Sequence, residues 1–340
     1  MRRFYLIIPF LATLGCNMPR TESSYSRPAG LLSSPQPTAA QQVEALPSYV
    51  PLNPDSLQGT IACVGSDSMD PLLQLWADTF HQHYPDISFG IISKGSGTAP
   101  EALANGTSQV GHMSREMTPE ELSKFQAKFG YLPTRLVVAM DALAVYVNGN
   151  NPVPSLTLEQ VDAIFSSTRR AGYARDLVTW GDLGLGDVWT NRVIQPYGRD
   201  PQSGTRVFFK EHVLKKGEYK SNLKEVPDQF ALVEAPAADA SGISYGPIQH
   251  SVRMVKSVPI VDFKGTTPIP PTVENVLNGR YPLTRFLYIY VNRKPGRLMD
   301  PKVMEFIKFI LSSQGQRAVA DFGAVALPAD LAKINLSKIQ

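Results

Sequence analysis

The sequence predicts an α/β protein in which short strands alternate with helices. From residue 59 onward, apolar runs end in turns rich in Gly and Ser, and segments with the apolar spacing of a helix follow them. Two longer runs of β character, 136–147 and 286–291, lie between blocks of mixed helix and strand. With 340 residues, 43% of them hydrophobic, the chain is long enough for about two domains with sizeable cores.

The first sixteen residues have the pattern of an export signal. Two arginines precede an apolar run over 4–15, which is shorter than the roughly 20 residues of a membrane-spanning helix. Cys16 follows this run directly, so we predict a lipoprotein-type signal over 1–16 in which Cys16 is lipidated. Thr13 stands where lipoproteins usually have Leu, and the alternative is an ordinary signal peptide or a plain apolar anchor.

Residues 17–56 differ in composition from the rest of the chain. They are rich in Pro, Ser, Ala and Gln, and their apolar residues follow neither a helical nor a strand period. Such a segment buries too little apolar surface to offset the entropy lost on ordering. We therefore predict a disordered tether over 17–56, between the N-terminal signal and a globular part.

The predicted elements follow in order after the tether. The strands are expected at 61–64, 87–92, 109–113, 136–147, 194–197 and 286–291. The helices are expected at 71–80, 100–104, 155–165, 203–215, 300–311 and 314–322, with one more that begins at Thr118. This alternation is typical of βαβ units around a mainly parallel sheet.

The two long β runs divide the globular part into two lobes. We predict that residues 57–142 and 285–340 form lobe I, and that residues 143–284 form lobe II, inserted between them. Two sequential domains are the alternative. No internal repeat is visible in the sequence.

The composition excludes several classes of protein. The formal net charge is +3 and the 33 Lys and Arg are scattered, so we expect no binding of nucleic acid. Two cysteines and five histidines do not make a disulfide framework or a metal cluster, and we expect neither a metal nor a cofactor. Cys63 lies in an apolar strand and is expected to be an inert core thiol. No phosphate-binding loop of nucleotide hydrolases is present.

Small hydroxyl residues occur in three turns, each shortly after a predicted strand and just before or at the start of a predicted helix. These turns are 66–68, 95–98 and 203–205. A helix start offers unpaired N–H groups and the positive end of the helix dipole, Gly lets the backbone approach a ligand, and Ser and Thr add hydroxyl donors. Each turn alone could be a helix cap. Together they predict a site for an oxyanion such as phosphate or sulfate.

An arginine accompanies the third turn. Arg199 stands four residues before Ser203, and its guanidinium group is a planar fork that matches two oxygens of an oxyanion. The alternative role for Arg199 is a surface ion pair with Asp200.

These segments resemble the substrate-binding protein of the phosphate-specific ABC transporter (Pst) family. The resemblance covers nearly all of 57–335, and its motifs lie at 65–69, 94–97, 113–117, 140–145, 198–206 and 281–291. It implies a two-lobed, type II periplasmic-binding-protein fold, in which each lobe is a mixed sheet flanked by helices. Such a protein closes over phosphate held in the interlobe cleft.

The resemblance also implies which residues contact phosphate. The matching contacts are Ser68, the Met69 amide, Ser96, Arg199, Ser203, Gly204 and Thr205. Arg115 departs from the best-known pattern, which has at this position an aspartate that accepts the proton of hydrogen phosphate. The Ser-Arg sequence is similar to another branch of the family, and we include Arg115 in the expected site. The family's second-lobe aspartate falls on Pro201, with Asp200 one place earlier.

Some carboxylate is needed to distinguish phosphate from sulfate. Hydrogen phosphate carries a proton at neutral pH and sulfate does not, so a buried acceptor favours phosphate and repels sulfate. Asp141, on the long β run beside the expected cleft, is the preferred candidate, and Asp67 is the second. The alternative for Asp141 is an ion pair with Arg115 or Arg199.

The resemblance implies a binding protein and not an enzyme. It would bind inorganic phosphate outside the cytoplasmic membrane, in the periplasm or on the outer cell surface, and deliver it to the permease subunits of an ABC transporter. We expect a monomer that is held to membrane lipid through Cys16. The alternatives are the same fold with sulfate or an organic phosphate, or a surface protein for sensing or adhesion. An exported phosphatase or sulfatase would need a nucleophile with a paired base or a two-metal cluster, and the sequence indicates neither.

Overall fold

The computed structural model describes residues 43–250 and 252–339, and these form an α/β fold, as predicted. The predicted signal over 1–16, with Cys16, and residues 17–42 of the predicted tether lie outside the described residues. No helix within 43–250 or 252–339 is long and apolar enough to cross a membrane.

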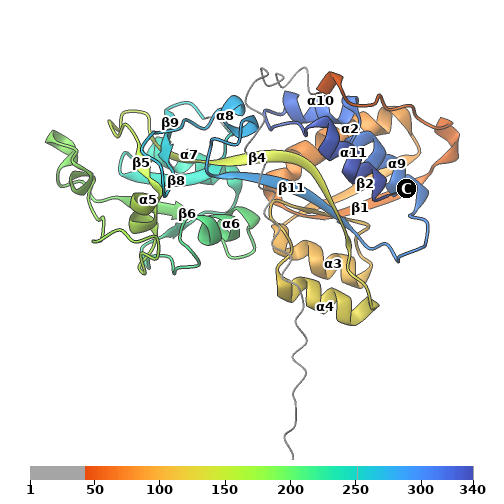
Figure 1. The fold of residues 1–340 in the computed structure, drawn as a ribbon, viewed down its shortest axis with the longest axis horizontal. Coiled ribbons are helices and arrows are strands. Elements are labelled where there is room, and N and C mark those ends of the chain that lie inside the picture. Colours follow the sequence, from red (N-terminus) through yellow and green to blue (C-terminus); the bar gives the residue numbers. More distant parts are fainter. Residues whose placement is uncertain (1–42, 251, 340) are drawn as a thin grey trace, which may run out of the picture. The chain divides into compact units, whose positions relative to one another are not determined.

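Strands and helices alternate through most of the described chain (Figure 1). The strands are β1 (Gly59–Gly65), β2 (Ile87–Ser93), β3 (Val110–Met113), β4 (Thr134–Asn148), β5 (Leu156–Thr157), β6 (Gln195–Gly198), β7 (Lys224–Glu225), β8 (Gly242–Pro247), β9 (Val255–Val258), β10 (Ile260–Val261) and β11 (Thr284–Val291). The helices are α2 (Asp70–His83), α3 (Ala99–Asn105), α4 (Pro119–Phe129), α5 (Leu158–Phe165), α6 (Gly204–His212), α7 (Gln229–Ala238), α8 (Val273–Leu277), α9 (Pro301–Ile310), α10 (Ser313–Asp321) and α11 (Ala329–Ser337). All the predicted strands and helices are present, with shifted ends.

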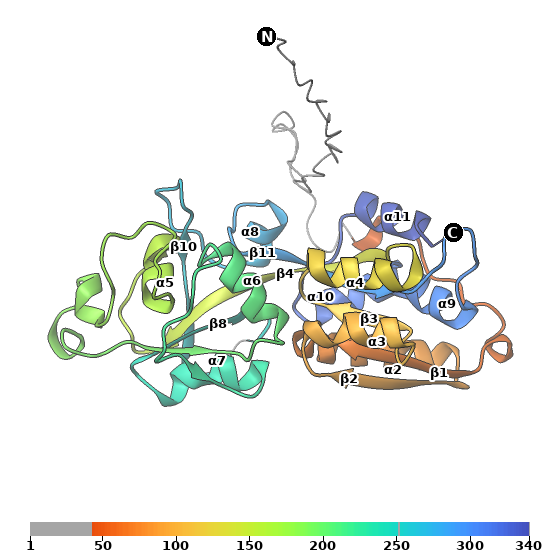
Figure 2. The ribbon, with the colours of Figure 1, turned by 90° about the horizontal axis from the view of Figure 1, so that it is seen from below.

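One mixed sheet runs through both halves of the described fold. Its strand order is β2-β1-β3-β11-β4-β8-β6-β7, and β9 also pairs with β4. The first half of β4 pairs with β11, and its second half pairs with β8 and β9, all antiparallel. β4 and β11 therefore run side by side, between the half of the sheet that contains β1, β2 and β3 and the half that contains β6, β7 and β8 (Figures 1 and 2).

The described fold has two main hydrophobic cores, which define its two lobes. The core of lobe I gathers buried side chains from 46–139 and 287–339, and the core of lobe II gathers them from 142–283, with Val325 added. Because β4 contributes to both cores, it connects the lobes without a separate linker. Cys63 is fully buried in the sheet of lobe I, and this burial raises the pKa of its thiol.

The predicted tether is wrong for residues 43–49, which pack on lobe I, whereas residues 50–56 are exposed. Leu46 and Tyr49 are buried in its core. The Tyr49 hydroxyl lies 3.0 Å from the Tyr84 hydroxyl and 3.1 Å from Glu305 Oε2, and the Tyr49 amide donates to Gln314 Oε1 at 2.8 Å. The sequence pattern missed this segment because its few apolar residues have no period of their own and bind partners that are distant in the chain.

Candidate functional site

Three parallel strands bring the hydroxyl-bearing turns of lobe I together. β2, β1 and β3 are neighbours in the sheet and run in the same direction. The short 3-10 helix η2 (Asp67–Met69) follows β1, η3 (Ser96–Thr98) follows β2, and Ser114 follows β3 directly. The turns therefore meet at the carboxyl edge of the sheet, where open α/β sheets bind their ligands.

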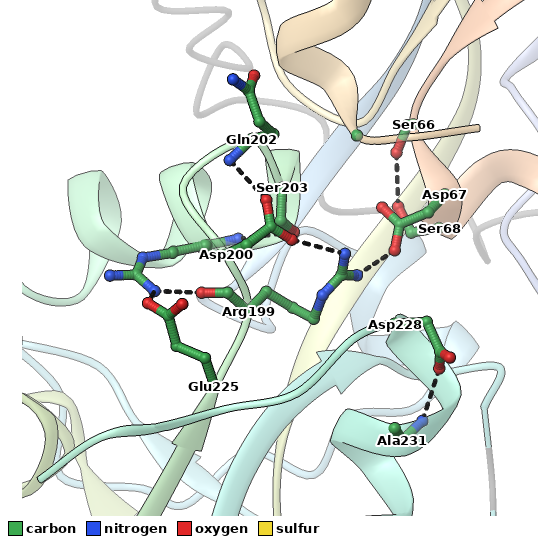
Figure 3. Close-up of polar contacts among 12 residues, drawn as sticks. Ser66, Asp67, Ser68, Arg199, Asp200, Gln202, Ser203, Glu225, Asp228 and Ala231 are labelled. Carbon is green, nitrogen blue, oxygen red and sulfur yellow. Dashed lines mark hydrogen bonds and ion pairs between the residues drawn. The ribbon is translucent and has the colours of Figure 1, made fainter. Parts of the chain in front are cut away.

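Four serines from these turns form one buried chain of hydrogen bonds. Ser68 Oγ lies 2.9 Å from Ser66 Oγ (Figure 3), and Ser66 Oγ donates to Ser114 Oγ at 3.0 Å. Ser114 Oγ lies 3.3 Å from Ser96 Oγ, and the Ser114 amide donates to the same oxygen at 3.0 Å. None of the four residues is more than 2% exposed. We predicted Ser68 and Ser96 as contacts, and Ser66 lies in the predicted turn 66–68 without a role of its own. Ser114 was missed, although it follows the third parallel strand at the same edge.

Arg199, the predicted arginine of lobe II, bonds a carboxylate from each lobe. It follows β6 and is 2% exposed. Its Nη1 donates to Asp67 of lobe I, and its Nη2 donates to Asp200 Oδ2 at 3.0 Å (Figure 3). Arg199 Nε and Asp67 Oδ1 are buried without a hydrogen-bond partner among the residues that the structure describes. The pair with Asp200 is thus present, and a second ion pair of Arg199, with Asp67, crosses between the lobes.

The turn that begins α6 faces the serine chain. Ser203 is the N-cap, and its Oγ accepts the Arg206 amide at 3.4 Å. The next amides of this first turn have no helical carbonyl to bond. A Cβ atom on Gly204 would lie 2.2 Å from Ser96 Oγ and 2.4 Å from Ser114 Oγ. The two lobes therefore meet at a position where only glycine fits.

A second contact joins the lobes at the η3 turn. The Gly97 amide donates to the Gln202 carbonyl oxygen at 3.2 Å. Gly95 has a φ of 111°, and a Cβ there would lie 2.6 Å from the same oxygen. Glycines at these positions allow the backbone before α6 to approach η3 closely.

Most of the predicted phosphate contacts lie together between the lobes. The residues gathered there are Ser68, Ser96, Arg199, Ser203 and Gly204. Met69 and Thr205 lie on the same turns, but their polar groups have protein partners. The Met69 amide donates to the Ser66 carbonyl at 3.2 Å, and Thr205 Oγ1 accepts from Arg285 Nη1 at 3.1 Å.

Arg115 forms a bidentate ion pair within lobe I. Its Nη1 and Nη2 donate to the two carboxylate oxygens of Glu121 at 2.7 Å each, and Nη1 also donates to the Glu116 carbonyl. Glu121 belongs to the capping box of α4, where it accepts the Thr118 amide. The charge of Arg115 is therefore balanced locally, and both of its terminal nitrogens are engaged.

Asp141 pairs with Arg285, so the alternative that it pairs with Arg115 or Arg199 is wrong. Asp141 Oδ2 accepts Arg285 Nε at 2.9 Å and Nη2 at 2.6 Å, and Oδ1 accepts the Ala142 amide at 2.7 Å. Both residues are buried, and they stand directly opposite each other on β4 and β11. Arg285 was not predicted, because only the register of these strands brings it to Asp141.

We expect the Asp141→Asn variant to lose stability and to keep its ligand preference. The variant leaves the buried Arg285 charge without a counter-charge, which typically costs about 3–5 kcal/mol of unfolding free energy. Urea unfolding checks this cost, and a ratio of phosphate to sulfate affinity equal to that of the unchanged protein is expected alongside it. A stable variant that no longer distinguishes the two anions would instead make Asp141 the proton acceptor.

A hollow of about 520 Å³ beside α6 is a different feature. Three of its lining residues, Arg206, Lys210 and Lys220, are cations. Each already has a carboxylate partner, in the pairs Arg206–Glu225, Lys210–Glu218 and Lys220–Asp176. The hollow therefore offers an anion no unbalanced charge. Within 43–250 and 252–339, no group of three or more His, Cys, Asp or Glu is placed to hold a metal ion.

Comparison with protein families and curated proteins gives consistent matches. A family model described as a PBP superfamily domain matches residues 51–314. The phosphate-binding protein PstS of Pseudomonas aeruginosa strain PAO1 is 42% identical over 289 residues, which is 85% of this chain and 89% of that protein. The phosphate-binding protein PstS of Staphylococcus saprophyticus is 30% identical over 276 residues, or 80% of this chain and 81% of that protein.

Solved structures share the fold. A crystal structure from Clostridium perfringens, provisionally described as a phosphate ABC transporter substrate-binding protein with bound phosphate, has a TM-score of 0.65 and 26% identity, and covers 79% of this chain and 100% of its own. An ABC-type phosphate transport receptor from Vibrio cholerae has a TM-score of 0.62 and 22% identity over 79% of this chain and 100% of its own, which shows the fold alone. The two-lobed binding-protein fold that we predicted is therefore confirmed.

Proposed function

Because the chain belongs to the PstS family of phosphate-binding proteins within the PBP superfamily, we propose that it binds inorganic phosphate between lobe I and lobe II. The observation that carries this proposal is the meeting of hydroxyl donors from lobe I with a buried guanidinium and a helix start from lobe II. Ser68 and Ser96 bind the ligand from one side, and Arg199 with the first turn of α6 binds it from the other.

Closure of the lobes follows from this division of donors. A ligand shifts an open–closed equilibrium only by its difference in affinity for the two forms. Phosphate held by lobe I alone gains the Arg199 and Ser203 contacts only when the lobes close. A micromolar affinity corresponds to about −8 kcal/mol, which several charge-assisted hydrogen bonds to one dianion can supply.

Asp67 replaces Asp141 in this proposal as the acceptor of the ligand's proton. Asp141 has both carboxylate oxygens engaged by Arg285 and the Ala142 amide. Asp67 Oδ1 is buried and has no partner among the described residues, and it lies next to Ser68 in the same turn. A carboxylate oxygen in that state favours a ligand that can donate a proton to it, and it repels a fully ionised one.

We expect the Asp67→Asn variant to lose preference for phosphate over sulfate by about 10-fold or more, since one unpaired buried group is worth about 1–3 kcal/mol. Isothermal titration with each anion at neutral pH measures this ratio. Asp200→Asn is the matched control, because Asp200 also bonds Arg199 but uses its other oxygen on the Gln202 amide. An unchanged ratio in the Asp67 variant would exclude Asp67 as the acceptor. Unmodified protein that binds sulfate more tightly than phosphate would overturn the proposed ligand.

Delivery to an ABC transporter completes the proposed role. The partner is a membrane permease that recognises the closed form, and the protein acts as a monomer outside the cytoplasmic membrane. Residues 1–16 direct export, and a lipid on Cys16 holds the protein to the membrane through the residues that follow. A mass spectrum of the purified membrane fraction tests the lipid, because a diacylglyceryl or triacyl group on Cys16 has a defined mass.

We assign no catalytic reaction to the protein. One Ser–His contact does occur in lobe I, where Ser93 Oγ lies 3.2 Å from His112 Nε2. The Ser93 hydroxyl donates to Asp70, however, and burial lowers the pKa of His112 to about 3, which makes it a poor general base near neutral pH. Absence of turnover with a generic phosphate ester is the expected result.

A further inference from the structure

The serine chain contains two members that we assigned no contact with phosphate. Ser66 and Ser114 are fully buried. Ser66 lies between Ser68 and Ser114 in the chain of hydrogen bonds, and Ser114 lies between Ser66 and Ser96. Ser114 is the member that connects all the parts, since it bonds Ser66 and Ser96 and stands against Gly204 of lobe II.

The hydrogens in this chain can be assigned one by one. A serine hydroxyl donates one hydrogen and accepts two. Ser66 donates its hydrogen to Ser114 Oγ, so the Ser68 hydroxyl donates to Ser66 in this structure and must turn to reach a ligand. The Ser114 hydrogen is then available to Ser96 Oγ at 3.3 Å, and the Ser114 amide donates to the same oxygen at 3.0 Å. Ser114 thus fills both acceptor positions of Ser96.

The Ser96 hydrogen is left with one direction. Its oxygen accepts two hydrogen bonds from Ser114, so the hydrogen turns away from Ser114. Ser96 Oγ and Ser114 Oγ both lie against Gly204 at the start of α6, where a Cβ atom would come within 2.2 Å and 2.4 Å of them. The Ser96 hydrogen is therefore the one left for the phosphate that we place between the lobes.

We propose that Ser114 is a positioning residue that commits the Ser96 hydroxyl to donate toward the ligand. This inference rests on the proposed phosphate site. Ser114 does not contact phosphate itself, because its hydroxyl and amide are both used inside the chain. A donor whose oxygen already accepts two bonds is polarised, and it needs no reorientation when an anion arrives. Ser66 supports the arrangement by directing its hydrogen to Ser114, which turns the Ser114 hydrogen toward Ser96.

A double-mutant cycle on phosphate affinity tests this role. We expect Ser114→Ala to weaken phosphate binding about 10-fold, and Ser96→Ala to weaken it by at least as much. In the Ser96→Ala background, Ser114→Ala should add less than about a 2-fold loss, because Ser114 acts through the Ser96 hydroxyl. A purely structural role for Ser114 would make the two losses multiply, and that result would overturn the inference.

Two further variants keep the test decisive. Ser108→Ala is the matched control, since Ser108 is a buried serine of the same lobe that donates to the Ala62 and Val110 carbonyls, and its loss should leave phosphate affinity within about 2-fold. Ser114→Cys replaces Ser114→Ala in the cycle if the alanine variant does not fold, and the same non-additivity is expected. Unmodified protein that gives no heat with phosphate overturns the proposed function, and the inference with it. Phosphate binding with multiplying losses overturns the inference alone.

Discussion

Replacement of Arg199 by methionine is expected to weaken phosphate binding about 100- to 4000-fold. Arg199 is 2% exposed and is the cation that bonds Asp67 across the lobes. Without it, the proposed dianion would meet the Asp67 and Asp200 carboxylates with no positive charge between them. Loss of one partner from a buried charged contact typically costs about 3–5 kcal/mol, which gives this range. Isothermal titration with phosphate measures the change.

Two variants separate charge from geometry in this result. Arg199→Lys keeps the charge but loses the planar fork, and we expect a loss of about 10- to 100-fold. Arg175→Met removes an exposed arginine of lobe II and should leave the affinity unchanged. Because Arg199→Met leaves Asp67 unpaired, the thermal unfolding of this variant is measured in parallel. We expect the double variant Arg199→Met with Asp67→Asn to regain stability but not phosphate binding. Near-normal affinity in a folded Arg199→Met variant would remove Arg199 from the site.

Replacement of Gly204 by alanine is expected to block closure and to weaken phosphate binding about 100-fold. The new Cβ would lie 2.2 Å from Ser96 Oγ and 2.9 Å from Ser96 Cβ, where real contacts do not occur. The serine chain is buried and its members hydrogen-bond one another, so it cannot give way cheaply, and the lobes must separate instead. Each lobe keeps its own core, and thermal stability should therefore change little. Titration gives the affinity, and X-ray scattering with and without phosphate gives the closure.

Other glycines provide graded controls for this effect. Gly97→Ala meets Gln202 Oε1 at 2.3 Å, but this atom is the far end of an exposed flexible side chain, so we expect a small loss that Gln202→Ala relieves. Gly186→Ala has nothing within 4 Å and should have no effect. A Gly204→Ala variant that closes on phosphate as the unmodified protein does would show that the contact between α6 and the serine chain is absent from the closed form.

Much of the fold could be predicted because its elements carry local signals. The apolar residues that predicted α2, among them Leu72, Trp76 and Phe80, are fully buried, and the Thr118 start of α4 has the capping box that its sequence indicated. α7 was missed because its apolar residues surround the helix without forming a stripe, and Pro236 lies inside it. β8 and β9 are short strands without a strong pattern.

The features of the candidate site also divide into those that could be predicted from the sequence and those that could not. The turns after β1, β2 and β6 were predictable, since each combines small hydroxyl residues with a strand end and a helix start. The ion pairs were not, because they depend on which residues the sheet places opposite each other. Asp141 and Arg285 are 144 residues apart and meet only through the register of β4 and β11. Ser114 was missed for a related reason, since its role depends on two neighbours from other turns.

A crystal structure of the protein grown with phosphate tests the central claim most directly. We expect one phosphate ion between the lobes, within hydrogen-bond distance of Ser68, Ser96, Arg199 and Ser203, with Asp67 Oδ1 facing one of its oxygens. A phosphate ion that contacts residues of one lobe only, or that binds elsewhere, would contradict the proposed site.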